Sequence, residues 1–142
     1  PILPGLMENQ AEHFVQSGLA GSYDISIIQT SGEPIGFIGM RSLSATVEYL
    51  VALYLLPDFQ RQGIGSKVLH FLEGILEENK IRDWLCQVHN QAKWAKQFYL
   101  ANGFETTRQG REEIEAYENG LLKDLALPDC VLMRKRFESS GS

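Results

Sequence analysis

The segment from residue 60 to residue 66 combines residue types and spacing that suit the binding of a phosphate group. It reads Gln-Arg-Gln-Gly-Ile-Gly-Ser and lies between an apolar run and an amphipathic one. Glycines at the point where a strand passes into a helix leave backbone N–H groups free, and these groups bind anions together with the helix dipole. A side chain there would hold a phosphate away from the backbone. We therefore predict phosphate contacts from the N–H groups of Gln62, Gly63, Ile64, Gly65 and Ser66.

Two better-known glycine loops do not fit this segment. A Walker A loop ends in Gly-Lys-Ser or Gly-Lys-Thr, whereas Gly65 is followed by Ser66 and then Lys67. A dinucleotide-binding loop needs a third glycine, and that position is occupied by Val68. On this segment alone, a plain strand-to-helix turn that carries two glycines remains an alternative.

A second segment downstream narrows the interpretation. Residues 95–105 read AKQFYLANGFE, and a strand-like run separates them from the glycine loop. The loop resembles motif A of the GCN5-related N-acetyltransferase (GNAT) family, and the second segment resembles the family's Tyr-x-x-x-Gly-Phe signature. The resemblance covers the central and C-terminal parts of the chain. It implies acetyl-CoA as cosubstrate, with its pyrophosphate on the glycine loop, and it implies no metal.

The family resemblance also implies a fold of the α/β class. We expect the GNAT (acyl-CoA N-acyltransferase) fold, a mixed and mostly antiparallel sheet of about six strands with flanking helices. Two parallel strands should splay apart, helped by a bulge in the central strand. The pantetheine arm should lie in the gap and pair with the backbone of Leu53 and Leu55.

Three side chains acquire candidate roles from the resemblance. Tyr99 stands at the family's tyrosine position, where the phenol would protonate the leaving thiolate. The side chains of Gln60 and Arg61 can reach phosphate oxygens, which the guanidinium of Arg61 matches well. Gln60 stands where many relatives carry arginine, so we expect Arg61 to replace part of the absent charge. A core tyrosine and a solvated surface arginine are the plainer alternatives for Tyr99 and Arg61.

Two further assignments depart from the family pattern. Glu48 lies near the family's glutamate base, although its register is off by one residue, which reverses the face of a strand. His89, Tyr49 and a water chain are the competing routes for the proton of the amine. The family's helix-start asparagine corresponds to Ala92 here, so Asn90 is a candidate helix cap and CoA ligand.

The composition is that of a single globular domain. The 142 residues include 44% hydrophobic and 22% charged residues. The net charge of −5 argues against a nucleic-acid partner, and no apolar run is long enough for a membrane span. The two cysteines lie in apolar runs without metal-ligand spacing, so we expect buried thiols and a cytoplasmic protein.

The chain divides into short alternating segments. We expect one domain over residues 1–138 and a tail over 139–142, with the first strand of the family missing because residues 4–18 look helical. Residues 112–125 are ambiguous between a helical face and the strand with a long loop that the resemblance implies there. The other expected strands are residues 23–29, 35–41, 47–56, 83–88, 105–108 and 130–137, and the other expected helices are residues 66–79 and 91–102.

These observations lead to one functional hypothesis with two alternatives. We expect an N-acetyltransferase that moves an acetyl group from acetyl-CoA to a primary amine by direct attack in a ternary complex. The amine is a small molecule or a protein amine, and the sequence does not choose between them. One alternative is a non-catalytic acyl-CoA-binding or regulatory module. The other is a homodimer whose partner completes the site.

Overall fold

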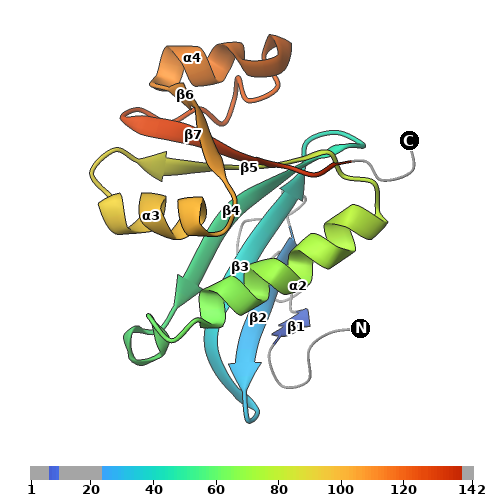
Figure 1. Cartoon of the computed structure of the whole chain (residues 1–142), viewed down its shortest axis with the longest axis vertical. Coiled ribbons are helices and arrows are strands. Elements are labelled where there is room, and N and C mark those ends of the chain that lie inside the picture. Colours follow the sequence, from blue (N-terminus) through green and yellow to red (C-terminus); the bar gives the residue numbers. More distant parts are fainter. Residues whose placement is uncertain (1–6, 10–23, 139–142) are drawn as a thin grey trace.

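The computed structural model describes residues 7–9 and 24–138, in which one sheet is flanked by helices (Figure 1). The strands are β1 (Met7–Asn9), β2 (Asp24–Thr30), β3 (Glu33–Ser42), β4 (Val47–Leu55), β5 (Asp83–His89), β6 (Glu105–Gln109) and β7 (Cys130–Arg136). The helices are α2 (Ile64–Glu78), α3 (Lys93–Ala101) and α4 (Arg111–Ala116), with short 3-10 turns η2 (Pro57–Phe59) and η3 (Tyr117–Asn119). None of these described helices has the length and apolar character of a membrane-spanning segment.

The sheet has the mixed topology that the resemblance implies. In the described chain its seven strands run in the order β1-β2-β3-β4-β5-β7-β6. The pair β4 and β5 is parallel, and every other neighbouring pair is antiparallel. The expected α/β fold with a mostly antiparallel sheet is therefore confirmed.

The central strand β4 separates from β5 part of the way along its length. The two strands pair from Val47 and Asp83 to Tyr49 and Leu85, and no later residue of β4 pairs with β5. Val51 is the extra residue of a β-bulge against β3, since Met40 pairs with Leu50 and Gly39 with Ala52. Figure 1 shows β4 and β5 diverging toward their C-terminal ends, with α3 beside the opening. The predicted splayed pair and bulge are thus present.

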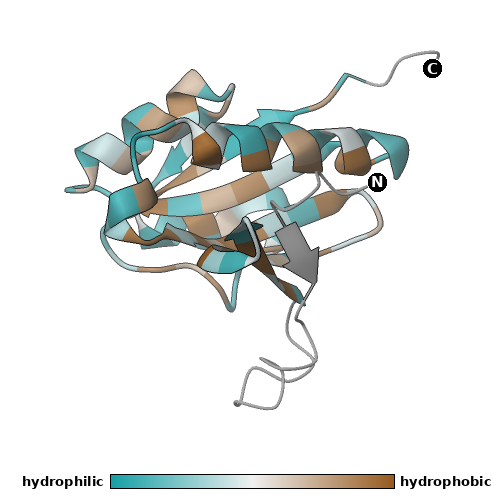
Figure 2. Ribbon diagram, turned by 90° about the horizontal axis from the view of Figure 1, so that it is seen from below, coloured by the Kyte–Doolittle hydropathy of each residue, from teal (hydrophilic) through white to brown (hydrophobic). Residues whose placement is uncertain are grey.

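The two faces of the sheet carry separate hydrophobic cores. The first core lies under α2, whose buried residues form the expected apolar stripe: Val68, Leu69, Leu72 and Leu76. Figure 2 shows α2 lying along one side of the sheet, with hydrophobic and hydrophilic residues alternating along it. The second core packs Ile114 and Tyr117 against Leu85 and Leu132. Burial on both faces explains why β4 reads as a nearly continuous apolar run.

The structure corrects the expectation for the start of the chain and decides an ambiguous range near its end. Residues 7–9 form strand β1, which pairs with β2, so a helix there is wrong and a first strand is present. The rest of the range 4–18 lies outside the described residues. The ambiguous range 112–125 contains α4 and η3 rather than a strand, because Ile114 and Tyr117 bury a helical face. The domain boundary at residue 138 stays a prediction.

A buried carboxylate holds the end of the sheet where β4 and β5 still pair. Asp83 is 0% exposed, and its oxygens accept hydrogen bonds at 2.8 Å from Arg82 Nε and Arg136 Nε. Burial acts to raise the pKa of Asp83, but the bonds from Arg136 and Arg82 outweigh it and hold the pKa below its usual value. The ionised carboxylate therefore links β5 to β7 at the closed end of the splayed pair.

We predict that Asp83→Asn lowers the free energy of unfolding by about 2 kcal/mol at neutral pH, because the charge-assisted hydrogen bonds of the buried carboxylate are lost, while the two half-exposed arginines remain solvated. The pKa of Asp83 is depressed by folding, so this stabilisation is present above the ordinary pKa of aspartate and is lost as pH falls through the folded value. Urea denaturation of both proteins between pH 7 and about pH 3 measures this. A difference in stability that does not shrink in acid would contradict it.

Candidate functional site

A cavity of about 810 Å³ occupies the opening between β4 and β5. Residues 50–55 of β4 and residues 86–89 of β5 form its two sides. The glycine loop closes one end through Gln60, Arg61, Gly63, Gly65 and Ser66. Helix α3 covers it with residues that include Trp94, Phe98 and Tyr99. The segments that carry the two sequence motifs thus meet in one cavity.

The glycine loop presents a row of free backbone donors. None of the backbone N–H groups of residues 62–66 donates a hydrogen bond to another described residue, and the first such bond in α2 runs from Lys67 to Gly63 O at 3.1 Å. Arg61 and Gly63 have positive φ angles of 62° and 80°. Left-handed residues at such a turn point successive N–H groups inward and form an anion-binding hollow. The loop therefore has the geometry expected of a phosphate site.

The start of α2 is fixed against α3. A Cβ atom at Gly65 would lie 3.0 Å from the Phe98 ring, so only glycine allows this approach without movement of the ring. Asn102 Nδ2 donates a hydrogen bond of 3.1 Å to Ser66 Oγ. The sequence analysis did not select Asn102, although it stands directly before the Gly-Phe of the second motif. The two helices therefore hold the loop and Tyr99 in a fixed relation.

The free edge of β4 faces the cavity. Leu56 N–H donates to Ile35 O of β3 at 2.7 Å, and alternate residues of an antiparallel strand bond the same neighbour. The backbone N–H and C=O groups of Tyr54 therefore face β3, whereas those of Leu53 and Leu55 point toward the opening. One of them is engaged, because Gln60 Nε2 donates to Leu55 O at 2.8 Å. A free edge is therefore present at Leu53 and Leu55, with Gln60 on one of its acceptors, and the pairing of pantetheine with this edge stays a prediction.

Tyr99 lies on the cavity wall in an apolar setting. Its ring contacts those of Phe98 and Phe104 edge-on, with centroid distances of 5.1 and 5.3 Å. Its hydroxyl makes no hydrogen bond to any residue that the structure describes. Burial, with smaller effects from Cys86 and Tyr49, raises the pKa of Tyr99 well above its usual value. A phenol in this position keeps its proton until a strong base forms beside it.

The cavity reaches both faces of the sheet. Val47 and Tyr49, before the bulge, pack into the second core, whereas Leu53 beyond it packs against the first. The bulge therefore reverses the faces, and Tyr54 points to the side of the second core. Leu53 and Phe98 line the cavity on the side of the glycine loop, and Tyr54 and Gln87 line it on the opposite face. Tyr54 is 44% exposed, so the cavity meets the surface on that face as well, and this end is called the second opening below.

Four of the predicted site residues lie outside the cavity lining: Glu48, Gln62, Ile64 and Asn90. Gln62 and Ile64 still contribute free N–H groups to the loop. Asn90 does not cap α3, because the helix begins at Lys93 with Ala92 as its N-cap and without a side-chain cap. The capping role predicted for Asn90 is therefore wrong, and its role as a CoA ligand stays a prediction.

Glu48 lies at the closed end of the splayed pair. It pairs with Trp84, and its Oε2 accepts a hydrogen bond of 2.8 Å from Ser42 Oγ. Burial raises the pKa of Glu48, the bond from Ser42 lowers it, and nearby Asp24 raises it, with a net increase. The part of β4 that lines the cavity begins at Leu50, two residues beyond Glu48, and Glu48 is not part of the lining. The Glu48 carboxylate therefore has no direct contact with the cavity.

The chain matches a family model described as an acetyltransferase (GNAT) domain over residues 21–106. No curated protein sequence matches the chain significantly.

Solved structures with the same fold include three with named ligands. A GNAT family acetyltransferase from Elizabethkingia anophelis with acetyl-CoA bound has 18% identity, covers 96% of this chain and 92% of its own, and gives a TM-score of 0.68. The PaiA N-acetyltransferase from Thermoplasma acidophilum with coenzyme A has 21% identity, coverages of 89% and 68%, and a TM-score of 0.67. Naa50 from Arabidopsis thaliana with the bisubstrate analogue CoA-Ac-MVNAL has 22% identity, coverages of 80% and 72%, and a TM-score of 0.62.

We predict that Tyr99 stays protonated throughout the range in which an ordinary tyrosine ionises. Since burial raises its pKa, Tyr99→Phe should leave the tyrosinate absorbance between about pH 9 and pH 11 unchanged. Spectrophotometric titration of both proteins, with free N-acetyltyrosinamide as the reference, measures this. A smaller absorbance change in the variant over that range would contradict the prediction.

Proposed function

The chain belongs to the GNAT acetyltransferase family, and from this premise we propose that it transfers the acetyl group of acetyl-CoA to a primary amine by direct attack in a ternary complex. One observation carries the proposal. A single cavity connects the free amides of the glycine loop, the free edge of β4 and the Tyr99 hydroxyl. These three features match the phosphate, amide and thioester parts of the cosubstrate.

The residues of this chain can hold acetyl-CoA at several points. The N–H groups of residues 62–66 suit the pyrophosphate, and Arg61 at the cavity end adds a positive charge. The backbone of Leu53 and Leu55 suits the amides of the pantetheine arm, as an added strand would pair with a sheet edge. Gln60 must release Leu55 O when the arm binds there. The acetyl-CoA and CoA held by relatives of the same fold support this fit.

The two openings of the cavity suit two substrates that bind at once. Acetyl-CoA occupies the end beside the glycine loop, which leaves the opening beside Tyr54 and Gln87 for the amine. The bisubstrate analogue bound to the Arabidopsis relative joins CoA to a peptide in one molecule, which supports an amine on the far side of the thioester. Holding both substrates in line removes much of the entropic barrier to reaction.

The transfer needs one proton donor and one proton acceptor. The amine nitrogen attacks the thioester carbonyl carbon, the carbon–sulfur bond breaks, and the amide and the thiolate of CoA are formed. Tyr99 donates its hydroxyl proton to that thiolate, and the proton lost by the amine returns to Tyr99 through solvent. The Tyr99 phenol is protonated at neutral pH, so the donor is ready before each turnover.

The acceptor of the amine's proton has several candidates. His89 lines the cavity, but its Nδ1 already accepts the Gln91 N–H at 3.1 Å. The Tyr49 hydroxyl accepts a hydrogen bond from Gln87 at 2.9 Å, and burial raises the pKa of Tyr49 to about 12. The lone pair of His89 Nδ1 is therefore occupied, and the Tyr49 phenol keeps its proton at neutral pH. We infer that water in the open cavity carries this proton, and the base role expected for Glu48 from the sequence is the alternative that the variant below tests.

We predict that the protein binds acetyl-CoA and that Tyr99→Phe lowers kcat by about a hundredfold or more, because the leaving thiolate loses its acid. The affinity for CoA should change by less than about twofold, because the ring contacts remain. Thiol release with benzylamine, N-acetyllysine and a peptide with a free amino terminus measures kcat, and calorimetry measures CoA binding.

The matched control is Tyr117→Phe, which removes a hydroxyl in the second core and should leave both quantities unchanged. Full turnover in Tyr99→Phe would exclude the acid role. CoA binding by the wild type without acetylation of any amine would favour the non-catalytic module. Absence of CoA binding would exclude the proposed function.

We predict that Glu48→Gln keeps kcat/KM within about threefold of the wild type, because the carboxylate has no contact with the cavity. The pH–rate profiles of the two proteins should therefore have the same acidic limb. A catalytic base is active only when ionised, so activity that depends on Glu48 would fall as pH decreases through its raised pKa. Loss of that limb in the variant, with a large fall in rate, would instead establish Glu48 as the base.

A further inference from the structure

The side chain of Gln87 connects three parts of the molecule at the second opening of the cavity. Its Nε2 donates to Leu125 O at 2.8 Å and to Tyr49 Oη at 2.9 Å. Its Oε1 accepts the Leu127 N–H at 2.9 Å. Gln87 itself lines the cavity. Both donor hydrogens of the amide and one of its two acceptor positions are therefore used by the protein.

The position of Gln87 on β5 lets its side chain connect β5 to β4 beyond the last backbone pair. The last backbone pair of β4 and β5 joins Tyr49 and Leu85, and Gln87 stands two residues farther along β5. Its bond to the Tyr49 hydroxyl thus crosses from β5 to β4 at the point where their backbones separate. This side-chain contact therefore links the two strands where their backbone pairing has ended.

The other two bonds hold the segment formed by residues 120–129, which connects η3 to β7. Its backbone bonds at Lys123, Leu125 and Ala126 are local turns. Between residues 121 and 128, the hydrogen bonds that reach the sheet from the described chain are the two made by Gln87. Leu122 and Ala126 anchor the segment from below, since both are buried in the second core. At the end of the segment Asp129 O accepts the Asn90 N–H at 2.8 Å, so it is between residues 121 and 128 that the Gln87 amide alone joins the described backbone to the sheet.

We propose that Gln87 is the positioning residue of the amine side of the site, where it holds the 120–129 segment beside the second opening and keeps β4 and β5 at a fixed distance. This inference rests on the proposed function, because it assigns the second opening to the amine. Gln87 acts through Tyr49 and the segment and takes no part in proton transfer. Its loss should weaken amine binding and leave acetyl-CoA binding intact.

The test is Gln87→Leu, which keeps the approximate size of the side chain and removes all three hydrogen bonds. The KM for the fastest amine among benzylamine, N-acetyllysine and the peptide should rise by at least about fivefold, as expected from the loss of a net hydrogen bond. The KM for acetyl-CoA and the Kd for CoA should stay within about twofold. An unchanged KM for the amine, or an equal loss of CoA affinity, would overturn the proposal.

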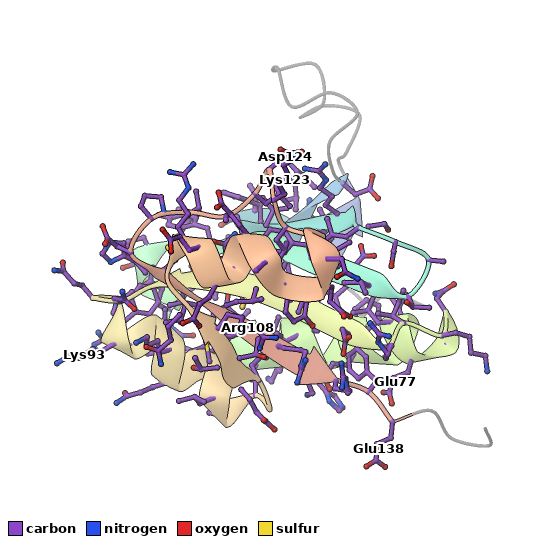
Figure 3. The ribbon with its side chains drawn as sticks, turned by 90° about the horizontal axis from the view of Figure 1, so that it is seen from above. Glu77, Lys93, Arg108, Lys123, Asp124 and Glu138 are labelled. Atoms are coloured by element: carbon purple, nitrogen blue, oxygen red, sulfur yellow. The ribbon has the colours of Figure 1, made fainter. Side chains whose placement is uncertain are left out.

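A structural measurement separates positioning from general damage. Lys123 is exposed within the 120–129 segment, and Figure 3 labels it at the outer edge of the molecule. Trypsin should cleave after Lys123 faster in Gln87→Leu than in the wild type, whereas Gln109→Leu on β6 should match the wild type. Equal cleavage in all three proteins would overturn the proposal. This measurement needs no activity, so it decides the role of Gln87 even if the proposed function fails.

Two further variants distinguish the contact of Gln87 with Tyr49 from its contacts with the 120–129 segment. Gln87→Glu keeps an acceptor for the Leu127 N–H and for the Tyr49 hydroxyl proton but cannot donate to Leu125 O. It should give a KM for the amine between those of the wild type and Gln87→Leu. Tyr49→Phe removes only the link to β4 and should leave cleavage at Lys123 unchanged. If cleavage increased in Tyr49→Phe as much as in Gln87→Leu, separate roles for the contact with Tyr49 and the contacts with the segment would be contradicted.

Discussion

The separation of β4 from β5 is the constraint on which the rest of the structure depends. Their backbone pairing ends at Tyr49 and Leu85, while β5 keeps its pairing with β7 along its whole length. The bulge at Val51 turns β4 away and changes the face to which its later residues point. Beyond this point β4 has unpaired backbone groups inside the molecule, which would be costly without a partner. The open edge is therefore suited to a ligand that carries amide groups of its own.

The elements around this opening are held rigidly. Asp83 and its two arginines fix the closed end, and Gly65 and Ser66 fix the start of α2 against α3. Lys135 on β7 also binds the carboxylate of Glu73 on α2 and the carbonyl of Asn102 at the end of α3. Contacts from strand to helix and from helix to helix thus keep the loop amides and Tyr99 at a set separation. Such pre-organisation lowers the cost of aligning two substrates.

The titratable groups near the cavity are mostly held in their neutral forms. Burial raises the pKa of the Cys86 thiol and of the Tyr49 and Tyr99 phenols, and each of these groups is neutral at physiological pH. A neutral phenol is suited to give a proton to a thiolate, and a neutral buried thiol is a poor nucleophile. These properties favour direct transfer between two bound substrates over a covalent relay through Cys86. The neutral Gln87 amide, held by its three hydrogen bonds, also lines the cavity.

The sequence by itself determined the family, the glycine loop, the tyrosine of the second motif and the apolar stripe of α2. Each of these depends on neighbouring residues, because glycine spacing and helical periodicity are local properties. Only the tertiary structure placed Glu48 at the closed end, left Asn90 outside the helix cap and made a helix of residues 111–116. It also brought Asn102 to Ser66, and Gln87 to Tyr49 and Leu125. Those positions depend on strand register and on contacts between distant segments, and a one-residue bulge is enough to reverse the face on which a side chain lies.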